Sequence, residues 1–301
     1  MGRLARELLP SSLPGWTVTC CWISFERGVG MEARPELVLR TIDSTIEAAL
    51  LSGALEPINT TIEVVEDAGV RFQLRQVDSL ERKRRHTRSR PPGFNPFLPP
   101  EPGLFVAELS ASHRCLLNKF PVLSRHLLVV PRTFEDQRQL LTVADFAATW
   151  PCLELLSGLA FYNGGLVAGA SQRHKHLQVV PLPLVPGEAG VPIAAAEVLP
   201  FRHARRDFAG VPDPVTLHAC YVALLQELAL WRDDGWQVGP YNLLLTRSWM
   251  LVVPRIRESW KKCSVNALGF AGALLVKNEA RAQRVRDAGP MRILCALAGT
   301  A

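Results

Sequence analysis

Three side chains able to take part in phosphorus chemistry recur at every second position of one short segment. They are His174, His176 and Gln178, in the sequence Gly-Ala-Ser-Gln-Arg-His-Lys-His-Leu-Gln of residues 169–178. The β-branched pair Val179-Val180 follows, so we expect this segment to be a strand. Side chains in a strand alternate between its two faces. The two imidazoles and the amide are therefore predicted to lie in a row on one face.

Three interpretations of this row compete. The first is that the histidines have only a structural role, which is the default for a single histidine. The second is a metal site, because His-x-His on a strand is a common ligand pair. A metal site needs further ligands, and no cysteine pair or carboxylate lies close in the sequence. The third interpretation, which we favour, is nucleophilic catalysis at a phosphorus centre.

Nucleophilic catalysis suits the residue types. Neutral imidazole is a good nucleophile near neutral pH because its unperturbed pKa is about 6.5. One ring nitrogen attacks, while the other donates a hydrogen bond that fixes the tautomer. Gln178 and the Ser171 hydroxyl can hold phosphate oxygens. Small residues upstream would let backbone amides approach a phosphate closely; they are Gly164, Gly165, Gly169 and Ala170.

Hydrophobic periodicity places the row in a mixed helical and stranded chain. Helical spacing of apolar residues predicts helices over residues 34–53 and 217–231, and a third that opens with Thr142 as its N-cap. A proline-rich stretch, residues 91–102, is expected to be a connector. Strands are predicted over residues 60–64, 70–75, 104–109, 115–117, 126–130, 159–162, 174–182, 242–246 and 250–253.

Composition excludes several classes of protein. The chain has 301 residues, 48% hydrophobic and 21% charged, which indicates one large globular domain or two joined halves. No apolar run approaches the roughly 18–20 residues of a membrane span, so no membrane partner is expected. Seven scattered cysteines without a Cys-x-x-Cys pair argue against a disulfide framework and a cysteine-built zinc site. Reduced cysteines and a cytoplasmic location are expected.

The net charge of +6 suits an anionic partner such as a nucleotide, polyphosphate, nucleic acid or membrane surface. Much of the excess lies in the basic run Arg82–Arg90. We interpret this run as a solvated loop and keep a polyphosphate or RNA contact as the alternative. Residues 1–30 lack the long apolar segment of a secretory signal. We interpret them as an extension outside the core, with Met31 as the start.

A repeated pentapeptide indicates a duplication. Leu-Val-Val-Pro-Arg occurs at residues 128–132 and again at 251–255. Asn118 and Asn242 precede the two copies at nearly the same spacing. The combination favours an ancient duplication over a chance match. Only the first copy is followed by the histidine row.

The histidine row also carries a family resemblance. Ser-Gln-x-His-Lys-His-Leu-Gln resembles the active-site motif of diadenosine tetraphosphate phosphorylases, also called ATP adenylyltransferases. These enzymes belong to the galactose-1-phosphate uridylyltransferase branch of the histidine-triad superfamily. The resemblance runs from about residue 31 to the C-terminus and leaves residues 1–30 outside it. Its further segments are residues 95–97, 116–122, 126–130, 161–165, 180–183, 241–246 and 249–255.

The resemblance implies a role for each matching residue. His176 matches the nucleophile that takes the adenylyl group, and His174 matches the preceding histidine that helps to orient it. Gln178 stands where hydrolytic histidine-triad proteins have a third histidine, and glutamine there is typical of the transferases. The other matching positions are expected to bind substrate: Asn163 and Ser171 the phosphates, Asn118 and Lys119 ribose and phosphate, with Gly164, Gly169 and Gln172 beside them. A turn residue is the alternative for Asn118.

Two departures separate this chain from the uridylyltransferases themselves. Lys175 stands where those enzymes usually have a proline between the histidines. Many of them also bind zinc through cysteines, and this chain has no such pair. No zinc is therefore expected, and both differences favour adenylyl over uridylyl transfer.

The resemblance implies an α+β fold in which duplicated histidine-triad-like halves form a mainly antiparallel sheet with packed helices. Residues 31–190 would be the half with the histidine motif, and residues 191–301 the half without it. The implied reaction is reversible phosphorolysis of diadenosine tetraphosphate to ATP and ADP through an adenylyl-histidine. Its partners would be nucleotides and inorganic phosphate, with Mg²⁺ accompanying the nucleotide; no nucleic acid is expected and no oligomeric state is predicted. A sugar-1-phosphate nucleotidyltransferase and a non-catalytic nucleotide- or RNA-binding protein remain as alternatives.

Overall fold

The computed structural model describes residues 35–77, 91, 93–185, 187 and 189–300. The expected extension 1–30 and the basic run Arg82–Arg90 lie outside the described residues. The helices are α1 (Pro35–Ser52), α3 (Val143–Leu155), α4 (Pro214–Glu227), α5 (Ala267–Ala271), α6 (Glu279–Ala288) and α7 (Pro290–Ala298). The strands are β1 (Thr60–Asp67), β2 (Val70–Val77), β3 (Phe105–Glu108), β4 (His113–Leu117), β5 (Leu127–Pro131), β6 (Leu159–Gly164), β7 (Leu177–Val180), β8 (Ala204–Asp207), β9 (Tyr241–Leu245), β10 (Trp249–Pro254), β11 (Ser259–Trp260), β12 (Cys263–Ser264) and β13 (Ala273–Val276).

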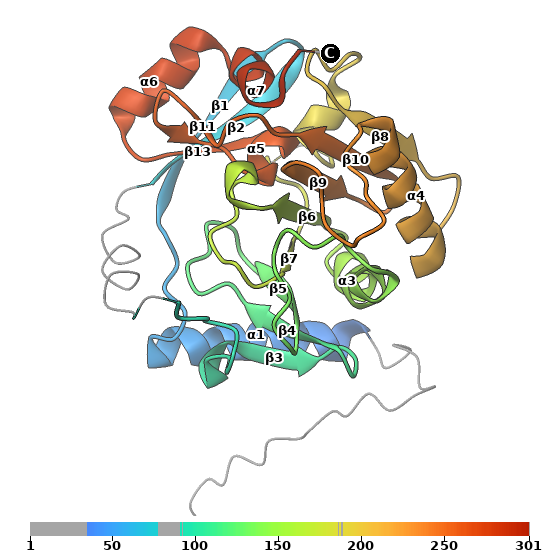
Figure 1. Cartoon of the computed structure of the whole chain (residues 1–301). Coiled ribbons are helices and arrows are strands. Elements are labelled where there is room, and N and C mark those ends of the chain that lie inside the picture. Colours follow the sequence, from blue (N-terminus) through green and yellow to red (C-terminus); the bar gives the residue numbers. More distant parts are fainter. Residues whose placement is uncertain (1–34, 78–90, 92, 186, 188, 301) are drawn as a thin grey trace, which may run out of the picture.

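The centre of the molecule is an eight-stranded sheet with the order β3-β4-β5-β7-β6-β9-β10-β8 (Figure 1). Every neighbouring pair in it is antiparallel. The inner strands β5, β6, β9 and β10 are mostly apolar and all their residues are buried, as expected of strands covered on both faces. The predicted α+β class with a mainly antiparallel sheet is confirmed.

A second sheet was not predicted. It has three strands in the order β1-β2-β13, and β13 runs parallel to β2. The expectation that the two halves share one sheet holds, because β6 pairs with β9, and the three-stranded sheet is an addition to it. A four-residue apolar run such as Ala-Leu-Leu-Val has too few residues for its periodicity to identify it as a strand.

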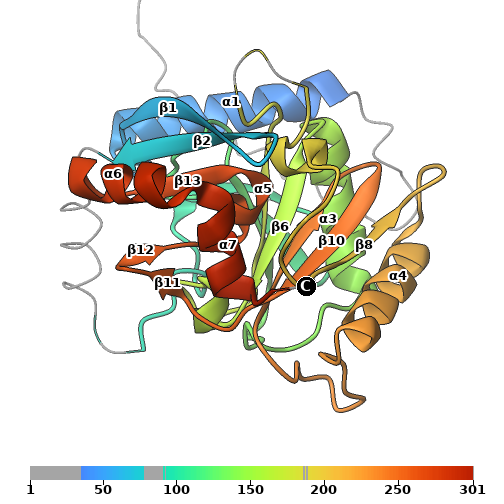
Figure 2. The same ribbon diagram turned by 90° about the horizontal axis from the view of Figure 1, so that it is seen from above.

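Different elements cover the two faces of the eight-stranded sheet. Helices α1, α3 and α4 pack on one face and bury alternate strand residues in a single apolar cluster. The three-stranded sheet and helices α5, α6 and α7 bury the other face from β6 to β10, and on β7 only Val180 belongs to the same cluster. Figure 2 shows α3 and α4 on one side of the strands and α6, α7 and β13 on the other. Over β4 and β5 this second face carries a small separate cluster around Phe97.

The connection β5-α3-β6-β7 is repeated by β8-α4-β9-β10. In both units the first strand pairs with the last, and the last pairs with the third. The units join where β6 pairs with β9. The two pentapeptide copies lie on β5 and β10, which hold different places in this repeat. The topology supports a duplication, but the pentapeptide is not its sequence signature.

The strand register gives the correspondence between the units. One row of directly opposed residues crosses six strands: Leu128, Gln178, Phe161, Leu244, Leu251 and Arg205. The row is symmetrical about the pairing of Phe161 with Leu244. Gln178 on β7 therefore corresponds to Leu251 on β10, and His176, two residues earlier, corresponds to Trp249.

Helix α3 begins as its sequence predicts. The Thr142 side chain accepts a hydrogen bond from Asp145 N, and the Asp145 carboxylate accepts one from Thr142 N at 2.7 Å. This reciprocal pair satisfies backbone amides that the helix leaves unpaired. It also places the Asp145 carboxylate, 1% exposed, directly beneath the histidine segment. None of the described helices is both long and apolar enough to cross a membrane.

Candidate active site

The histidine segment is only partly a strand. β7 begins at Leu177, and His174 makes a single bridge to Asp136 outside it. The prediction of a strand from residue 174 is wrong because the backbone there bonds to the segment after β5 instead of to the sheet. Lys175 N donates to Glu135 O at 2.7 Å, and Gln137 N donates to Arg173 O at 2.7 Å.

The expected alternation of faces nevertheless holds. Gln178 lies opposite Leu128, which belongs to the cluster around Phe97. The Phe97 ring centroid lies 5.6 Å from that of His174 and 5.4 Å from that of His176. The three residues of the row therefore share one face of the sheet, as predicted. Leu177 and Val179 point the other way, into the cluster beneath α1, α3 and α4.

His176 is held from its backbone and from one ring nitrogen. Its N–H donates to Gln137 Oε1 at 2.8 Å, and its Nδ1 lies 2.8 Å from His174 O. Because a carbonyl oxygen only accepts, Nδ1 must carry the hydrogen, and Nε2 must carry the lone pair. Nε2 makes no hydrogen bond to any described residue. The ring thus presents the nitrogen that can attack an electrophile.

Burial keeps this ring neutral. His176 is 5% exposed, and burial lowers its pKa to about 4, although the bond to His174 O opposes the shift. Burial also lowers the pKa of His174. Both imidazoles are therefore uncharged at neutral pH, which is the state that a nucleophilic histidine requires.

His174 orients His176 through its backbone, not through its ring. The His174 ring is engaged elsewhere: Nε2 donates to Pro131 O at 3.0 Å, and Nδ1 accepts from Asn95 Nδ2 at 2.9 Å. These two bonds lock the residue, and its carbonyl oxygen then fixes the tautomer of His176. The implied orienting role has a physical basis, in which the His174 ring is an anchor.

Gln178 ends a short hydrogen-bonded chain. Asn118 Nδ2 donates to His126 Nδ1 at 3.2 Å, and His126 Nε2 donates to Gln178 Oε1 at 3.1 Å. This assignment uses one tautomer of His126 throughout. The bond to His126 orients the Gln178 amide, and Nε2 makes no hydrogen bond within the described part of the chain, so the amide hydrogens are available to a substrate. A donor on the same face as His176 can stabilise a phosphate oxygen.

Asn163 and the glycines after it are tied into the protein itself. Asn163 Oδ1 accepts from Asn242 Nδ2 and from Ala267 N, both at 2.9 Å. Gly169 has a φ of +95°, and a Cβ there would lie 2.7 Å from Asn266 Cβ. A Cβ at Gly164 would lie 2.6 Å from Gln237 Oε1. Packing therefore explains these glycines without a ligand, while the predicted phosphate contacts stay predictions.

The remaining predicted substrate residues differ in their surroundings. Lys119 Nζ makes an ion pair with Glu101, with both N–O distances near 3 Å. Ser171 is exposed and Gln172 half-buried, and neither side chain makes a hydrogen bond to a described residue. Asn118 also accepts from Phe120 N, which is the geometry of a turn residue. Asn118 is thus both a turn residue and part of the chain that leads to Gln178.

Sequence reasoning did not single out several residues that hold the site. Asn95, Phe97, His126 and Gln137 contact or position the row, yet they lie on three separate segments. The first three fall inside segments that carry the family resemblance, so that signal could have found them. Gln137 had no such signal. It is 2% exposed, and its Nε2 also donates to Asn163 O at 2.9 Å.

Cations border the segment that precedes the row. Arg138 and Arg173 both bond to Asp136, and their side chains are 57% and 79% exposed. The Arg138 guanidinium also lies over Trp236, 5.3 Å from the ring centroid. Its hydrogen bond holds the pKa of Asp136 below the ordinary value. Two exposed guanidiniums beside one carboxylate leave an excess of positive charge, which attracts an anion.

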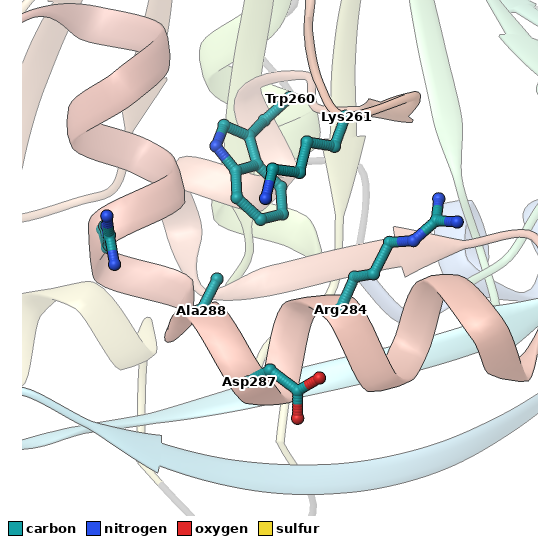
Figure 3. A pocket seen from close by; sticks show the side chains of 6 residues that line it. Trp260, Lys261, Arg284, Asp287 and Ala288 are labelled. Atoms are coloured by element: carbon teal, nitrogen blue, oxygen red, sulfur yellow. The ribbon is translucent and has the colours of Figure 1, made fainter.

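A hollow that none of these residues lines lies between the β11–β12 hairpin and helices α6 and α7. Its volume is about 310 Å³. Figure 3 shows the charged ends of its side chains spread apart around Trp260. It is lined by Trp260, Lys261, Arg284, Asp287, Ala288 and Arg292. Because its polar groups do not converge, we assign no chemistry to it.

No group of three or more histidine, cysteine, aspartate and glutamate side chains that could hold a metal ion occurs among the described residues. What this site offers is a neutral imidazole with a fixed tautomer, an amide donor beside it and positive charge nearby. That combination is suited to group transfer through a histidine.

Comparison with known proteins agrees with this class. The model of the Ap4A phosphorylase N-terminal domain, in which Ap4A is diadenosine tetraphosphate, matches residues 30–198. The model of the ATP adenylyltransferase C-terminal domain matches residues 197–299. This chain belongs to the Ap4A phosphorylase family.

Two relatives from Saccharomyces cerevisiae extend over most of the chain. Diadenosine 5',5'''-P1,P4-tetraphosphate phosphorylase 2 is 31% identical over 233 residues, which are 64% of this chain and 72% of that protein. Protein APA1 is 28% identical over 286 residues, which are 81% of this chain and 88% of that protein.

Solved structures show the same fold. The crystal structure of yeast Ap4A phosphorylase Apa2 in complex with AMP has a TM-score of 0.73 and 26% identity, and covers 87% of this chain and 97% of that one. The structure of Apa2 in complex with Ap4A has a TM-score of 0.71 and 25% identity, with the same coverage.

Proposed function

We propose that this chain is a nucleotidyltransferase that catalyses the reversible phosphorolysis of diadenosine tetraphosphate through a covalent adenylyl-histidine at His176. Family membership supports the reaction. The observation that carries the covalent route is the tautomer of His176: Nδ1–H faces His174 O at 2.8 Å, and Nε2 keeps its lone pair.

The reaction has two transfers. In the first, His176 Nε2 attacks the α-phosphorus at one end of the dinucleotide. The N–P bond forms, the bond from the α-phosphorus to its bridging oxygen breaks, and ATP leaves with that oxygen. In the second, an oxygen of inorganic phosphate attacks the same phosphorus, the N–P bond breaks, and ADP leaves. A phosphoramidate conserves much of the energy of the anhydride, which suits a reversible transfer.

Residues around His176 stabilise the charges that develop during the transfer. The adenylylated ring is cationic, and its Nδ1–H remains on His174 O, which stabilises the positive charge. The amide of Gln178 donates to a non-bridging or bridging oxygen as negative charge develops there. Its own oxygen is held by His126 at 3.1 Å, so the amide cannot rotate to present an acceptor instead.

The remaining substrate contacts follow from the family resemblance. We propose that Ser171 and Asn163 contact the phosphates, that Asn118 and Lys119 lie near ribose and phosphate, and that Gly164, Gly169 and Gln172 adjoin them. For Lys119 this role requires that its ion pair with Glu101 opens or shares the ligand.

Mg²⁺ is expected to accompany the substrate. The described residues hold no group of three or more metal-binding side chains, so we place the ion on the polyphosphate oxygens, where it would screen negative charge. We propose a cytoplasmic reaction with inorganic phosphate as the acceptor. The described cysteines Cys115, Cys152, Cys220, Cys263 and Cys295 are free thiols, which agrees with that location.

The decisive experiment is intact-protein mass spectrometry after incubation with diadenosine tetraphosphate in the absence of phosphate. We expect one acid-labile adenylyl adduct, which phosphate discharges as ADP. His176→Ala should form none. His203→Ala is a matched control, because His203 Nδ1 makes the same type of bond, to Phe201 O at 2.8 Å, outside the site; it should form the adduct normally. Hydrolysis without an adduct would contradict the covalent route.

A further inference from the structure

The residue between the two histidines is an unusual one for its position. Lys175 points to the same side of the sheet as Leu177 and Val179, where the neighbouring side chains are apolar. It is only 1% exposed. A buried ammonium is costly unless it is paired and hydrogen-bonded, so a lysine here needs a physical reason.

Each hydrogen of the Lys175 ammonium has an acceptor in the structure. Lys175 Nζ lies 2.6 Å from Glu135 Oε2, 3.2 Å from Leu140 O and 3.4 Å from Asp145 Oδ2. An ammonium has three hydrogens, and three acceptors surround it. Two are carboxylates, and the third is a backbone carbonyl.

Other hydrogen bonds hold the Asp145 carboxylate in place. Asp145 caps helix α3, and its Oδ2 also accepts from Thr142 N at 2.7 Å and Thr142 Oγ1 at 2.8 Å. Its Oδ1 lies 3.1 Å from His113 Nε2, on strand β4. Hydrogen bonds from these groups offset the burial that would otherwise raise the pKa of Asp145, and hold that pKa below its ordinary value. The carboxylate is therefore ionised, and Lys175 is bonded to a charge anchored to a helix end and a strand.

We propose that Lys175 is a positioning residue, which tethers the segment between His174 and β7 so that the His176 ring keeps its attacking nitrogen in place. This proposal rests on the proposed function of His176. The tether matters because sheet hydrogen bonds begin only at Leu177. Before that point, the segment is held by the bridge at His174, by Gln137 and by Lys175.

The side chain and backbone of Lys175 act at the same place. Its N–H donates to Glu135 O at 2.7 Å, while its ammonium binds the carboxylate of the same residue. Glu135 is thus gripped twice, and the segment that follows it brings Gln137 to His176 N. Loss of the ammonium removes one grip and loosens the backbone between His174, whose ring stays anchored, and the first sheet hydrogen bond at Leu177, so that the His176 ring can shift. A small misplacement of a reacting group lowers the rate steeply.

The test is the Lys175→Met variant, whose side chain is similar in length but carries no charge. We expect the rate constant for adenylylation per active site, measured in single turnover with diadenosine tetraphosphate, to fall about 10- to 100-fold. The KM for the dinucleotide should change less than about threefold, because Lys175 faces away from the substrate side. Counting active sites by adduct stoichiometry separates a slow site from an unfolded fraction.

Two further variants separate positioning from general stability. Lys175→Met leaves two carboxylates without their cation, and adding Glu135→Gln removes the charge of the partly exposed one, so part of the lost thermal stability should recover while the adenylylation rate stays low. Leu294→Ala, in the apolar cluster of α7, should lower stability and keep the wild-type rate constant per active site. If Lys175→Met does not fold, Glu135→Gln alone, on the partly exposed member of the pair, should slow adenylylation about three- to tenfold.

The experiments distinguish failure of the proposed function of His176 from failure of the positioning role of Lys175. If wild-type protein forms no adduct, the proposed function fails. If wild-type protein forms the adduct and Lys175→Met forms it at the wild-type rate, only the positioning role fails. Recovery of the wild-type rate in the double variant would also overturn that role, because it would show that the unpaired carboxylate, and not the lost tether, had slowed the reaction.

Discussion

The two repeated units, β5-α3-β6-β7 and β8-α4-β9-β10, have the same connections and different surroundings. At the register position of Gln178 the second unit has Leu251, and at that of His176 it has Trp249. Leu251 and Trp249 lie in the cluster that the three-stranded sheet and the C-terminal helices cover. Gln178 and His176 lie beyond the edge of that cover. The candidate site lies where the three-stranded sheet and the C-terminal helices leave this sheet face uncovered.

Hydrogen bonds connect the second unit, β8-α4-β9-β10, to the histidine row of the first unit. Arg255, at the end of β10, is 3% exposed and donates to Asn242 Oδ1 at 2.6 Å and Ala168 O at 3.3 Å. Burial lowers the pKa of Arg255 to about 10, so the side chain remains charged at neutral pH. Asn242 in turn bonds to Asn163, whose carbonyl oxygen accepts from Gln137. A hydrogen-bonded path therefore runs from the C-terminal unit to the backbone of His176.

The largest expected effect is at the position where the units differ most. His176→Ala should lower the turnover rate by about 10⁴-fold or more, as removal of other covalent nucleophiles does. Steady-state kinetics with diadenosine tetraphosphate and phosphate measures this loss. Circular dichroism should show an intact fold. Substantial turnover by the folded variant would mean that His176 is not the residue that accepts the adenylyl group.

Exchanging the paired side chains of the two units should give opposite results. Gln178→Leu copies the second unit into the first and should lower kcat/KM about 10²- to 10³-fold by removing a donor to the reacting phosphate. A loss of less than about threefold would refute that role. Leu251→Gln copies the first unit into the second. It buries an amide in an apolar cluster and should cost about 2 kcal/mol of unfolding free energy, with normal turnover per folded molecule.

Arg255→Met tests the supporting path at a smaller scale. It leaves Asn242 Oδ1 without a charged donor, and loss of such a bond lowers the free energy of unfolding by about 1.5–3 kcal/mol. Turnover per active site should fall less than about tenfold, because four bonds separate Arg255 from His176. Urea denaturation and active-site titration measure the two effects. A loss as large as that of Gln178→Leu would mean that Arg255 acts on the substrate.

Much of this arrangement could be predicted from local sequence. Helix α3 was predicted from Thr142 as its N-cap, and the structure adds the reciprocal bond of Asp145. Helix α1 and the inner strands followed from periodicity. The row of His174, His176 and Gln178 followed from the alternation of a strand, and its faces are confirmed.

What could not be predicted depends on partners distant in sequence. The start of β7 is displaced because residues 135–137 take its hydrogen bonds, some 40 residues earlier in the chain. The pentapeptide wrongly suggested that β5 corresponds to β10, because Val-Val-Pro is a common strand ending. Only the strand register shows that Leu251 corresponds to Gln178. The fixed tautomer of His176 comes from a carbonyl two residues away, yet the lock on that carbonyl comes from Asn95 and Pro131.

The smallest expected effect is on the pH dependence of adenylylation. Because burial lowers the pKa of His176 to about 4, the ring stays neutral from pH 8 down to about pH 5. The internal phosphates of diadenosine tetraphosphate have no second ionisation near neutral pH, so the substrate adds no change there. Single-turnover rates should therefore vary less than about twofold over this range. A fall centred near pH 6.5 would show an ordinary, exposed imidazole.

Stability should respond where the rate does not. The His176 ring binds a proton below about pH 6.5 in the unfolded chain, but only near pH 4 in the folded one. Between these values the unfolded state holds more protons, so the free energy of unfolding falls as the pH falls, by roughly 3 kcal/mol in full. His176→Ala should lack this part of the slope, whereas Trp249→Ala, at the corresponding position of the second unit, should keep it. Equal slopes in the two variants would show that His176 is not buried as a neutral base.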